Sequence, residues 1–317
     1  MIVGLDVGFG HLKWTTDGHT VHRMPAVAAP TWSEPDVVSG EHAWVVGEHA
    51  EREDATLAVA LDHERLARPE FQALLGYVFA TLPDEPLQIV SGLPYSATEE
   101  EQANYERQLR GFIGPYRVGE RVWQGPVTSV VLFRQAQAAL IDALFDERNR
   151  PRRPELLQEG LRIALIDVGY KTTDVVVAVL FPAYQIVREM SLSLDVGVHN
   201  VEAILQRAYQ RRYGAEMLDR ERMRLALDGK RIYRFGQPVS LPVEEAKRQV
   251  AERIRAGVVQ HWGRAISTVA RVFLAGGGAA LLGAHLAQPP LVAEMVTDPQ
   301  GANARGFYKL GRFAETA

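Results

Sequence analysis

The chain has 317 residues, a formal net charge of −4 and no cysteine, with 47% hydrophobic and 23% charged residues. This length exceeds what one hydrophobic core normally serves, so we expect two domains with separate cores, and the composition is that of a globular protein. The absence of cysteine excludes a disulfide scaffold, a thiol nucleophile and a cysteine metal site, and the net charge gives no general attraction to nucleic acid or anionic lipid.

The N-terminal segment predicts a strand, a tight turn and a second strand. Apolar residues 2–7 are interrupted only by Gly4 and Asp6, and a Gly8-Phe9-Gly10 turn leads into the next strand. Glycine lets the backbone approach an anion closely, and successive N–H groups in such a turn form an anion-binding nest. The turn therefore predicts a phosphate site, to which Lys13 would add a positive charge. No apolar run reaches the ~18 residues that span a bilayer, and the chain enters a strand without a signal sequence, which favours a cytoplasmic protein.

The next part of the chain predicts helices and a buried strand. Apolar residues at helical spacing follow Pro69 up to Leu82, and residues 87–93 read as a strand that Pro94 ends. Ser96 and Glu99 have the spacing of a capping box, so we expect a polar helix over about residues 97–110.

Two regions lack a clear periodic pattern. Residues 31–62 are expected to be irregular and poor in strands, and residues 216–236 are expected to form a second small subdomain. An apolar strand over 128–133 leads into a helix that contains Gln135 and Gln137, and a polar, proline-broken linker follows at 149–154.

The central stretch repeats the N-terminal pattern. An apolar run ends in Asp167-Val168-Gly169, a polar turn with Thr172 and Thr173 follows, and a second apolar run begins after Asp174. β-branched residues fill both arms, so the stretch predicts a hairpin with its polar groups at the tip. Two such turns at the heads of two halves indicate an internally duplicated fold.

The segments that follow predict two more strands and three helices. We expect a strand over 185–194, a helix that opens near Asp195 and reaches Tyr213, and a long helix from Glu244 towards Trp262. A hydrophobic strand then enters the triplet Gly276-Gly277-Gly278 and leaves in an Ala- and Leu-rich helix. A flat ring or a ribose can lie against glycine backbone where a side chain would block it.

The two Asp-Val-Gly turns and the glycine triplet, in this order, resemble the phosphate-1, phosphate-2 and adenosine motifs of the actin, sugar-kinase and heat-shock-chaperone ATPase superfamily. The opening residues 3–10, the strand end at 91–94, the 166–174 turn and residues 303–306 resemble the ParM group of bacterial and archaeal actin-like proteins of the plasmid-segregation type. The resemblance implies an α/β fold of two duplicated ribonuclease H-like, mixed-sheet domains with a nucleotide cleft between them. We expect the first domain over 1–155 plus a returning helix at 303–317, and the second over 156–302.

The resemblance also implies ATP or ADP with Mg²⁺ as cofactors. Asp6 and Asp167 would hold Mg²⁺ through its waters, since this ion keeps much of its hydration shell. Asp167 and a glutamine would orient the attacking water, and Gln135 fits the ParM-like position whereas Gln137 fits the actin pattern. A glutamine cannot take the proton and can only position the water. The residues expected to contact the nucleotide are Asp6, Gly8, Phe9, Gly10, Lys13, Gly169, Tyr170, Lys171, Thr172, Thr173, Lys247, Gly276, Gly277 and Gly278.

The resulting hypothesis is an ATPase that forms dynamic filaments and moves or positions a plasmid or other cargo through an adaptor protein. Its partners would be further copies of itself and that adaptor, without direct nucleic-acid or membrane contact. One alternative is a non-polymerising actin-like scaffold, which usually needs an amphipathic tail, whereas residues 313–317 are short and polar. Another is a small-molecule kinase, which needs a catalytic aspartate where Gln135 stands, and the nearest is Asp142.

The sequence lacks the features that define three other classes of protein. A heat-shock-type chaperone needs a substrate-binding domain after the returning helix, where this sequence ends at Ala317. The P-loop pattern is missing, and the dinucleotide fingerprint fails because Leu12 and Lys13 occupy the place of its third glycine.

Overall fold

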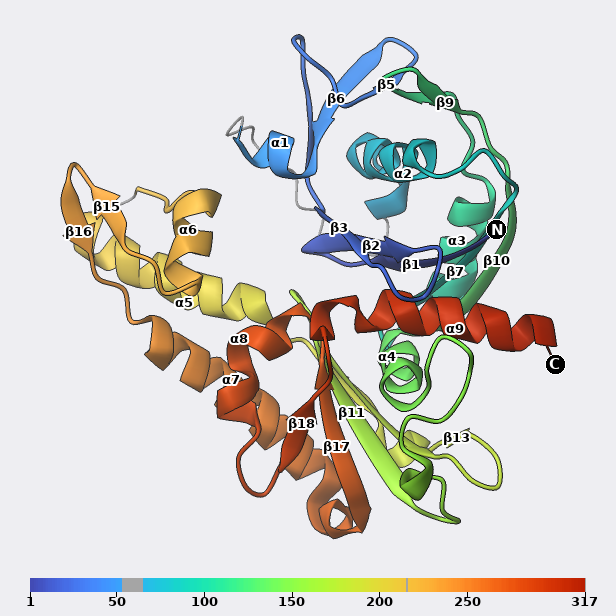
Figure 1. Cartoon of the computed structure of the whole chain (residues 1–317). Coiled ribbons are helices and arrows are strands. Elements are labelled where there is room, and N and C mark those ends of the chain that lie inside the picture. Colours follow the sequence, from blue (N-terminus) through green and yellow to red (C-terminus); the bar gives the residue numbers. More distant parts are fainter. Residues whose placement is uncertain (53–64, 215, 317) are drawn as a thin grey trace. The chain divides into compact units, whose positions relative to one another are not determined.

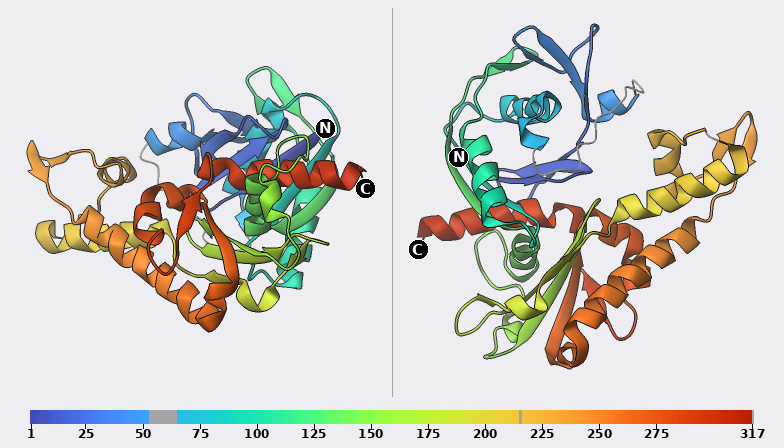
Figure 2. Two further views of the ribbon diagram at one scale, coloured as in Figure 1. Left: turned by 60° about the horizontal axis from the view of Figure 1, so that its bottom comes forward. Right: turned by 180° about the vertical axis from the view of Figure 1, so that it is seen from behind.

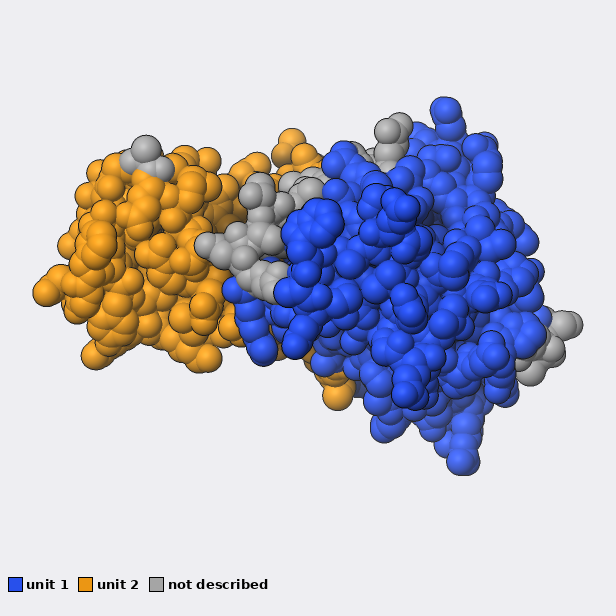
Figure 3. All heavy atoms as spheres, turned by 90° about the horizontal axis from the view of Figure 1, so that it is seen from above, with its two compact units in different colours: residues 1–153, 301–317 blue, residues 154–300 orange. Residues whose placement is uncertain are grey.

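The computed structural model describes residues 1–52, 65–214 and 216–316 (Figure 1). Contacts divide the chain into unit 1, residues 1–153 and 301–317, and unit 2, residues 154–300 (Figure 3). The boundaries expected from the sequence lie two residues further along the chain at both crossings.

Unit 1 is built on a five-stranded mixed sheet with the order β10-β7-β1-β2-β3. Its strands are β1 (Ile2–Val7), β2 (His11–Thr15), β3 (His22–Pro25), β7 (Leu87–Leu93) and β10 (Val127–Arg134). β1 pairs antiparallel with β2 and parallel with β7, and β7 pairs parallel with β10. The predicted strand–turn–strand motif is therefore confirmed, and its turn lies at the carboxyl end of β1.

A second sheet in unit 1 corrects the expectation for residues 31–62. Its order is β4-β6-β5-β8-β9, with β4 (Ala28–Pro30), β6 (His42–Val46), β5 (Val37–Ser39), β8 (Tyr116–Val118) and β9 (Arg121–Trp123). The expectation of an irregular segment was wrong for 31–52, which hold β5, β6 and α1 (Gly47–Arg52), while 53–62 lie outside the described residues. These strands are too short to give a periodic signal, and the sheet joins β5 to β8 from a distant part of the chain.

Helix α2 (Pro69–Thr81) confirms the predicted core helix, because Phe71, Leu74, Val78 and Phe79 are buried; the 3₁₀ turn η1 (Arg65–Ala67) precedes it. Helix α3 (Glu99–Arg110) starts later than predicted.

The cap of α3 is Thr98 rather than Ser96. Thr98 Oγ1 accepts a hydrogen bond from the Glu101 N–H at 3.1 Å, and a Glu101 side-chain oxygen accepts one from the Thr98 N–H at 2.7 Å. The sequence contains the capping-box spacing twice, two residues apart. The Ala97 N–H donates to the Pro94 carbonyl, which places Ser96 in a turn before the helix, whereas Glu99 is the first residue of the helix.

Unit 2 contains a sheet with the order β13-β12-β11-β17-β18, and β14 also pairs with β12. The strands are β11 (Arg162–Val168), β12 (Thr173–Val179), β13 (Gln185–Ile186), β14 (Leu192–Leu194), β17 (Val269–Ala275) and β18 (Ala293–Met295), and the short turn η2 (Pro154–Leu156) precedes them. β11 pairs antiparallel with β12 and parallel with β17. This arrangement repeats that of β1 with β2 and β7, so the predicted duplication is confirmed.

The prediction of a single strand over 185–194 was wrong. A 3₁₀ turn, η3 (Arg188–Met190), separates β13 from β14. The hydroxyl of Ser191 accepts a hydrogen bond from the Val177 N–H at 3.0 Å and donates one to the Val187 carbonyl at 3.0 Å. The Ser191 side chain thus replaces a backbone hydrogen bond of the β-ladder at this point, and this interrupts the strand.

The two longest helices of unit 2 lie beside its sheet and extend beyond it (Figures 1 and 2). The helices of this unit are α5 (Val198–Tyr213), α6 (Arg220–Leu227), α7 (Val243–Trp262) and α8 (Gly277–Leu286), with the 3₁₀ turns η4 (Gly263–Thr268) and η5 (Pro299–Gly301). α5 begins three residues later than predicted, because Gly197 is its N-cap. α6 and the hairpin of β15 (Ile232–Arg234) and β16 (Gln237–Val239) form the lobe expected near 216–236.

Two helices of unit 1 cross in close contact. They are α4 (Gln135–Leu144) and α9 (Ala302–Thr316), the last helix of the chain. A Cβ atom at Gly306 would lie 1.8 Å from the Ala138 carbonyl oxygen, so only glycine permits this approach. Within the described part of the chain, none of the helices combines the length and the apolar character that a bilayer crossing requires.

Candidate functional site

The first hairpin carries a buried acid at the end of β1. Asp6 is 1% exposed and lies opposite Lys13 in the β1–β2 register. The Lys13 Nζ atom lies 2.7 Å from Asp6 Oδ2. The cation thus compensates a carboxylate that would be costly to bury alone. The metal-associated acid and the phosphate-contacting lysine predicted from the sequence are partners of one another.

Helix α4 brings a glutamine to the same acid. Gln135 is the first residue of α4, and its Nε2 atom donates to Asp6 Oδ1 at 3.1 Å. Asp6 therefore receives one hydrogen bond on each carboxylate oxygen. Of the two glutamines left open by the sequence, Gln135 is the one that contacts Asp6.

The turn between β1 and β2 is tight. The Gly8 N–H donates to the His11 carbonyl at 3.1 Å, and a Cβ atom at Gly8 would lie 2.6 Å from that oxygen. Phe9 is buried, and the Gly10 carbonyl accepts a hydrogen bond from the Ala26 N–H at 2.9 Å. The Phe9 side chain therefore belongs to the core of unit 1, and only the backbone of this turn is available for contact with a ligand.

The second hairpin places another buried acid at the corresponding point of unit 2. Asp167 is 5% exposed near the end of β11 and lies opposite Asp174 in β12. Asp174 accepts hydrogen bonds from the hydroxyls of Thr172 (3.2 Å) and Ser193. The Thr173 hydroxyl donates to the Val196 carbonyl at 2.7 Å, so this side chain is committed to the protein itself.

The tip of the second hairpin is held against helix α5 of the same unit. The Gly169 N–H donates to the Thr172 carbonyl at 2.8 Å, which closes the turn that contains Tyr170 and Lys171. The Tyr170 hydroxyl donates to Glu202 Oε2 on α5 at 2.6 Å. Burial, together with the neighbouring Glu202 carboxylate, raises the pKa of Tyr170, and burial raises the pKa of Glu202. The Tyr170 side chain is therefore turned to α5.

The glycine triplet packs against the second hairpin. Gly276 has a φ of +86°, and a Cβ atom there would lie 2.3 Å from Asp167 Oδ1. A Cβ atom at Gly278 would lie 2.5 Å from Val168 Cγ1, whereas Gly277 is exposed at the start of α8. The triplet thus ends β17 and begins α8 beside Asp167, as the parallel pairing of β11 and β17 requires.

Lys247 lies on α7, which packs against α8. Its Nζ atom lies 2.9 Å from Glu244 Oε1, and the other oxygen of Glu244 lies 3.4 Å from His285 Nε2 on α8. The hydrogen bond from Lys247 lowers the pKa of Glu244. The three side chains form a polar cluster between the two helices, in which His285 was not expected from the sequence.

Comparison with family models covers most of the chain. Residues 4–137 match the model described as the N-terminal domain of actin-like proteins, and residues 165–288 match the C-terminal model of the MreB-like archaeal actin homologue. This chain is an actin-like protein. A comparison with curated protein sequences gave no match.

Solved structures share the actin-like fold over the whole chain. The 15-stranded ParM filament from Clostridium botulinum has a TM-score of 0.86 at 21% identity, over 98% of this chain and 99% of that one. A non-polymerisable quadruple mutant of pCBH ParM has a TM-score of 0.86 at 22% identity, with the same coverage. The archaeal actin homologue Ta0583 in complex with ADP has a TM-score of 0.80 at 22% identity, over all of both chains. The predicted two-domain actin-like fold is therefore confirmed.

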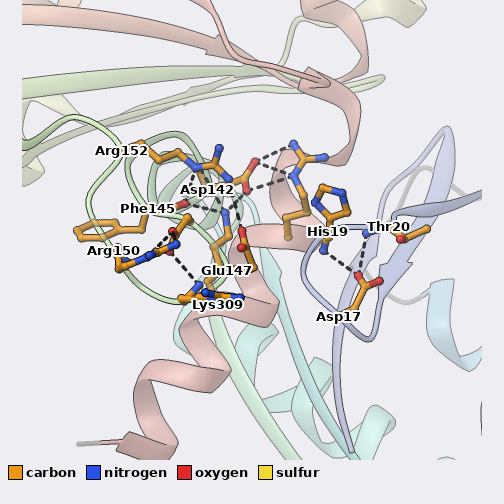
Figure 4. A network of polar contacts seen from close by, with 12 residues as sticks. Asp17, His19, Thr20, Asp142, Phe145, Glu147, Arg150, Arg152 and Lys309 are labelled. Carbon is orange, nitrogen blue, oxygen red and sulfur yellow. Dashed lines mark hydrogen bonds and ion pairs between the residues drawn. The ribbon is translucent and has the colours of Figure 1, made fainter.

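A buried ion network that was not predicted from the sequence joins α4 to α9 in this actin-like protein. Asp142 on α4 contacts Arg305 at 2.7 Å and Lys309 at 2.6 Å on α9. Lys309 is fully buried and also donates to the Phe145 carbonyl at 2.8 Å (Figure 4). Burial lowers the pKa of Lys309, and the Asp142 carboxylate opposes this effect. In the sequence, Asp142 is a single acid 163 residues before Arg305, so only the fold shows that the two residues pair.

The acids of the two hairpins, Asp6 and Asp167, are the residues that the sequence predicts to hold Mg²⁺. Among the residues described, no group of three or more His, Cys, Asp or Glu side chains could hold a metal ion. Each unit instead offers one buried carboxylate at the end of its first strand, Asp6 or Asp167. A single carboxylate of this kind suits Mg²⁺, which takes one or two carboxylates together with waters and the phosphates of a nucleotide.

Proposed function

We propose that this actin-like protein binds and hydrolyses ATP and forms filaments whose stability depends on the nucleotide. The observation that carries the proposal is the contact of Gln135 with Asp6 at the end of β1. The Gln135 amide, held beside this buried carboxylate, can orient a water molecule by hydrogen bonds but cannot take its proton. Slow hydrolysis of this kind would let the bound nucleotide set the lifetime of a filament.

The two tight turns would bind the phosphates. Unit 1 would contribute backbone N–H groups of its first turn and Lys13, and unit 2 would contribute the turn from Gly169 to Thr172. The exposed Gly277 and the start of α8 would accommodate the nucleoside, beside the helix that carries Lys247. Successive N–H groups and a helix start provide positive partial charge without a large side chain.

Asp6 and Asp167 would hold Mg²⁺ through its waters, and the ion would neutralise charge on the phosphates. At Asp6 we propose that the contact with Lys13 at 2.7 Å is exchanged for hydrogen bonds from the waters of the ion. The proposed change frees the Lys13 ammonium for a phosphate oxygen. The existing pair would thus keep both groups ordered before the nucleotide binds.

Further copies of the same chain are the partner that the relatives support best, since a solved relative is a ParM filament. We propose that this chain also assembles into filaments, in the cytoplasm, and that an adaptor protein connects them to plasmid DNA or other cargo. The alternative of a non-polymerising scaffold shares the same fold and differs in the absence of assembly.

The kinase alternative needs a catalytic aspartate that deprotonates a substrate hydroxyl, and Asp142 is the nearest aspartate to Gln135 along α4. Both oxygens of Asp142 contact cations, Arg305 and Lys309, and the residue is 6% exposed. A buried carboxylate whose two oxygens are both held by side chains of α9 is not placed to contact a substrate hydroxyl. This observation favours the ATPase over the kinase.

The test is right-angle light scattering combined with pelleting of the pure protein, with and without Mg-ATP, while phosphate release is followed in the same sample. Scattering that rises with ATP and decays as phosphate appears is expected. Phosphate release without scattering at high protein concentration would support the non-polymerising scaffold, and the absence of both would contradict the proposal.

A further inference from the structure

The start of helix α5 is hydrogen-bonded to the turn of the second hairpin. The Val198 N–H donates to the Gly169 carbonyl at 3.2 Å, and the His199 N–H donates to the Tyr170 carbonyl at 2.9 Å. His199 Nδ1 lies 3.0 Å from the same Tyr170 oxygen. Because a carbonyl oxygen can only accept, Nδ1 carries the proton in this contact. Two consecutive carbonyls of the turn are thus directed to α5.

This arrangement fixes the direction of two backbone donors. In a trans peptide the N–H points away from the preceding C=O, and the cis peptides of the described chain all precede proline. Since the carbonyls of Gly169 and Tyr170 point to α5, the N–H groups of Tyr170 and Lys171 point to the opposite side of the turn. Two adjacent N–H groups on one side are the elements of an anion nest.

Two further features hold the turn in place. The Tyr170 hydroxyl donates to Glu202 one helical turn further along α5, at 2.6 Å. At the helix start, a Cβ atom at Gly197 would lie 2.5 Å from the Tyr170 carbonyl oxygen, so glycine is required. The Asn200 side chain fixes this glycine by accepting a hydrogen bond from its N–H at 2.9 Å.

We propose that His199 and Glu202 are positioning residues that hold the 169–172 turn with its N–H groups directed at a phosphoryl group. Neither residue touches the ligand, and both act through Tyr170. This inference rests on the proposed function, because it assumes that the turn binds phosphate. It adds that the affinity for phosphate depends on α5 rather than on the hairpin alone.

The variants His199→Ala and Tyr170→Phe each remove one anchoring hydrogen bond. Their affinities for Mg-ATP and for adenosine would be measured by isothermal titration calorimetry, after circular dichroism has shown that they fold. We expect about fivefold weaker binding of Mg-ATP, the effect of one hydrogen bond, and unchanged binding of adenosine, which lacks phosphate. A general loss of structure would weaken both ligands together.

Two variants provide controls for these measurements. Tyr184→Phe removes a hydroxyl in unit 2 that has no hydrogen-bond partner among the described residues, so it should bind Mg-ATP like the wild type. His199→Asn keeps an N–H donor near the position of Nδ1 and should restore most of the affinity that His199→Ala loses.

The outcomes separate this inference from the proposed function. If the wild-type chain bound no Mg-ATP, the proposed function and this inference would both fail. If the wild type bound it and His199→Ala and Tyr170→Phe bound it equally well, or lost adenosine to the same extent, only the positioning by α5 would be refuted. Failure of His199→Asn to recover affinity would also refute the part assigned to Nδ1.

Discussion

The side-chain nitrogen of Gln135 lies 3.1 Å from Oδ1 of Asp6, although 129 residues separate them in the sequence. The parallel strands β1, β7 and β10 create this contact, because β1 ends at the turn that follows Asp6 and β10 leads directly into α4. The pair has a direct consequence for hydrolysis.

Gln135→Ala should lower the rate of phosphate release at least about tenfold while the affinity for ATP stays within about threefold, because the amide positions water and not the nucleotide. The matched control is Gln137→Ala, two residues further along α4, which should hydrolyse ATP like the wild type. Single-turnover phosphate release and equilibrium titration measure the two quantities. A slow Gln137→Ala variant with a normal Gln135→Ala variant would transfer the assignment to Gln137.

Gly276→Ala should destabilise the protein far more than an alanine at another glycine with positive φ. The new Cβ atom would meet Asp167 Oδ1 and the Val168 carbonyl, each at 2.3 Å. Gly229 has a φ of +73° and no atom within 4 Å of its Cβ position, so Gly229→Ala carries only the backbone cost. We expect Gly276→Ala to lose at least about 2 kcal/mol more of unfolding free energy, measured by urea denaturation. Equal losses would show that the contact with Asp167 relaxes freely.

Asp142→Leu should cost about 3–5 kcal/mol of unfolding free energy, because it leaves two buried cations without their shared carboxylate. Lys309→Met keeps the contact of Asp142 with Arg305 and should therefore cost less. Urea denaturation of the two variants gives the order. A larger loss for Lys309→Met would mean that its bond to the Phe145 carbonyl dominates the network.

Glu202 should make stability depend on pH. Burial raises its pKa in the folded protein above the ordinary value of 4.5, so between these two values the folded state binds more protons than the unfolded state. The contribution of Glu202 to stability is therefore largest below pH 4.5 and falls as pH rises through the raised pKa. Relative to Glu202→Gln, which does not titrate, the wild type should lose stability as pH rises from 4.5. Urea midpoints that change in parallel for both proteins would contradict this.

The sequence predicted the elements whose signal is local. Asp-Val-Gly turns between apolar runs, a glycine triplet after a strand and the apolar face of α2 follow from glycine geometry and from the period of strands and helices. The actin-like fold and its duplicated hairpins were therefore predictable. Where two overlapping local signals competed, as at Ser96 and Thr98, the turn at Pro94 decided between them.

The tertiary structure decided which side chains meet. Only the parallel pairing of distant strands brings Gln135 to Asp6 and Gly276 to Asp167, and only the crossing of α4 with α9 brings Lys309 to Asp142. The short strand β5 likewise pairs with β8, a partner far along the chain. The sequence by itself thus determined the turns and the fold class, because backbone geometry is local, while the fold determined the charge pairs, because electrostatic contacts depend on distance in space.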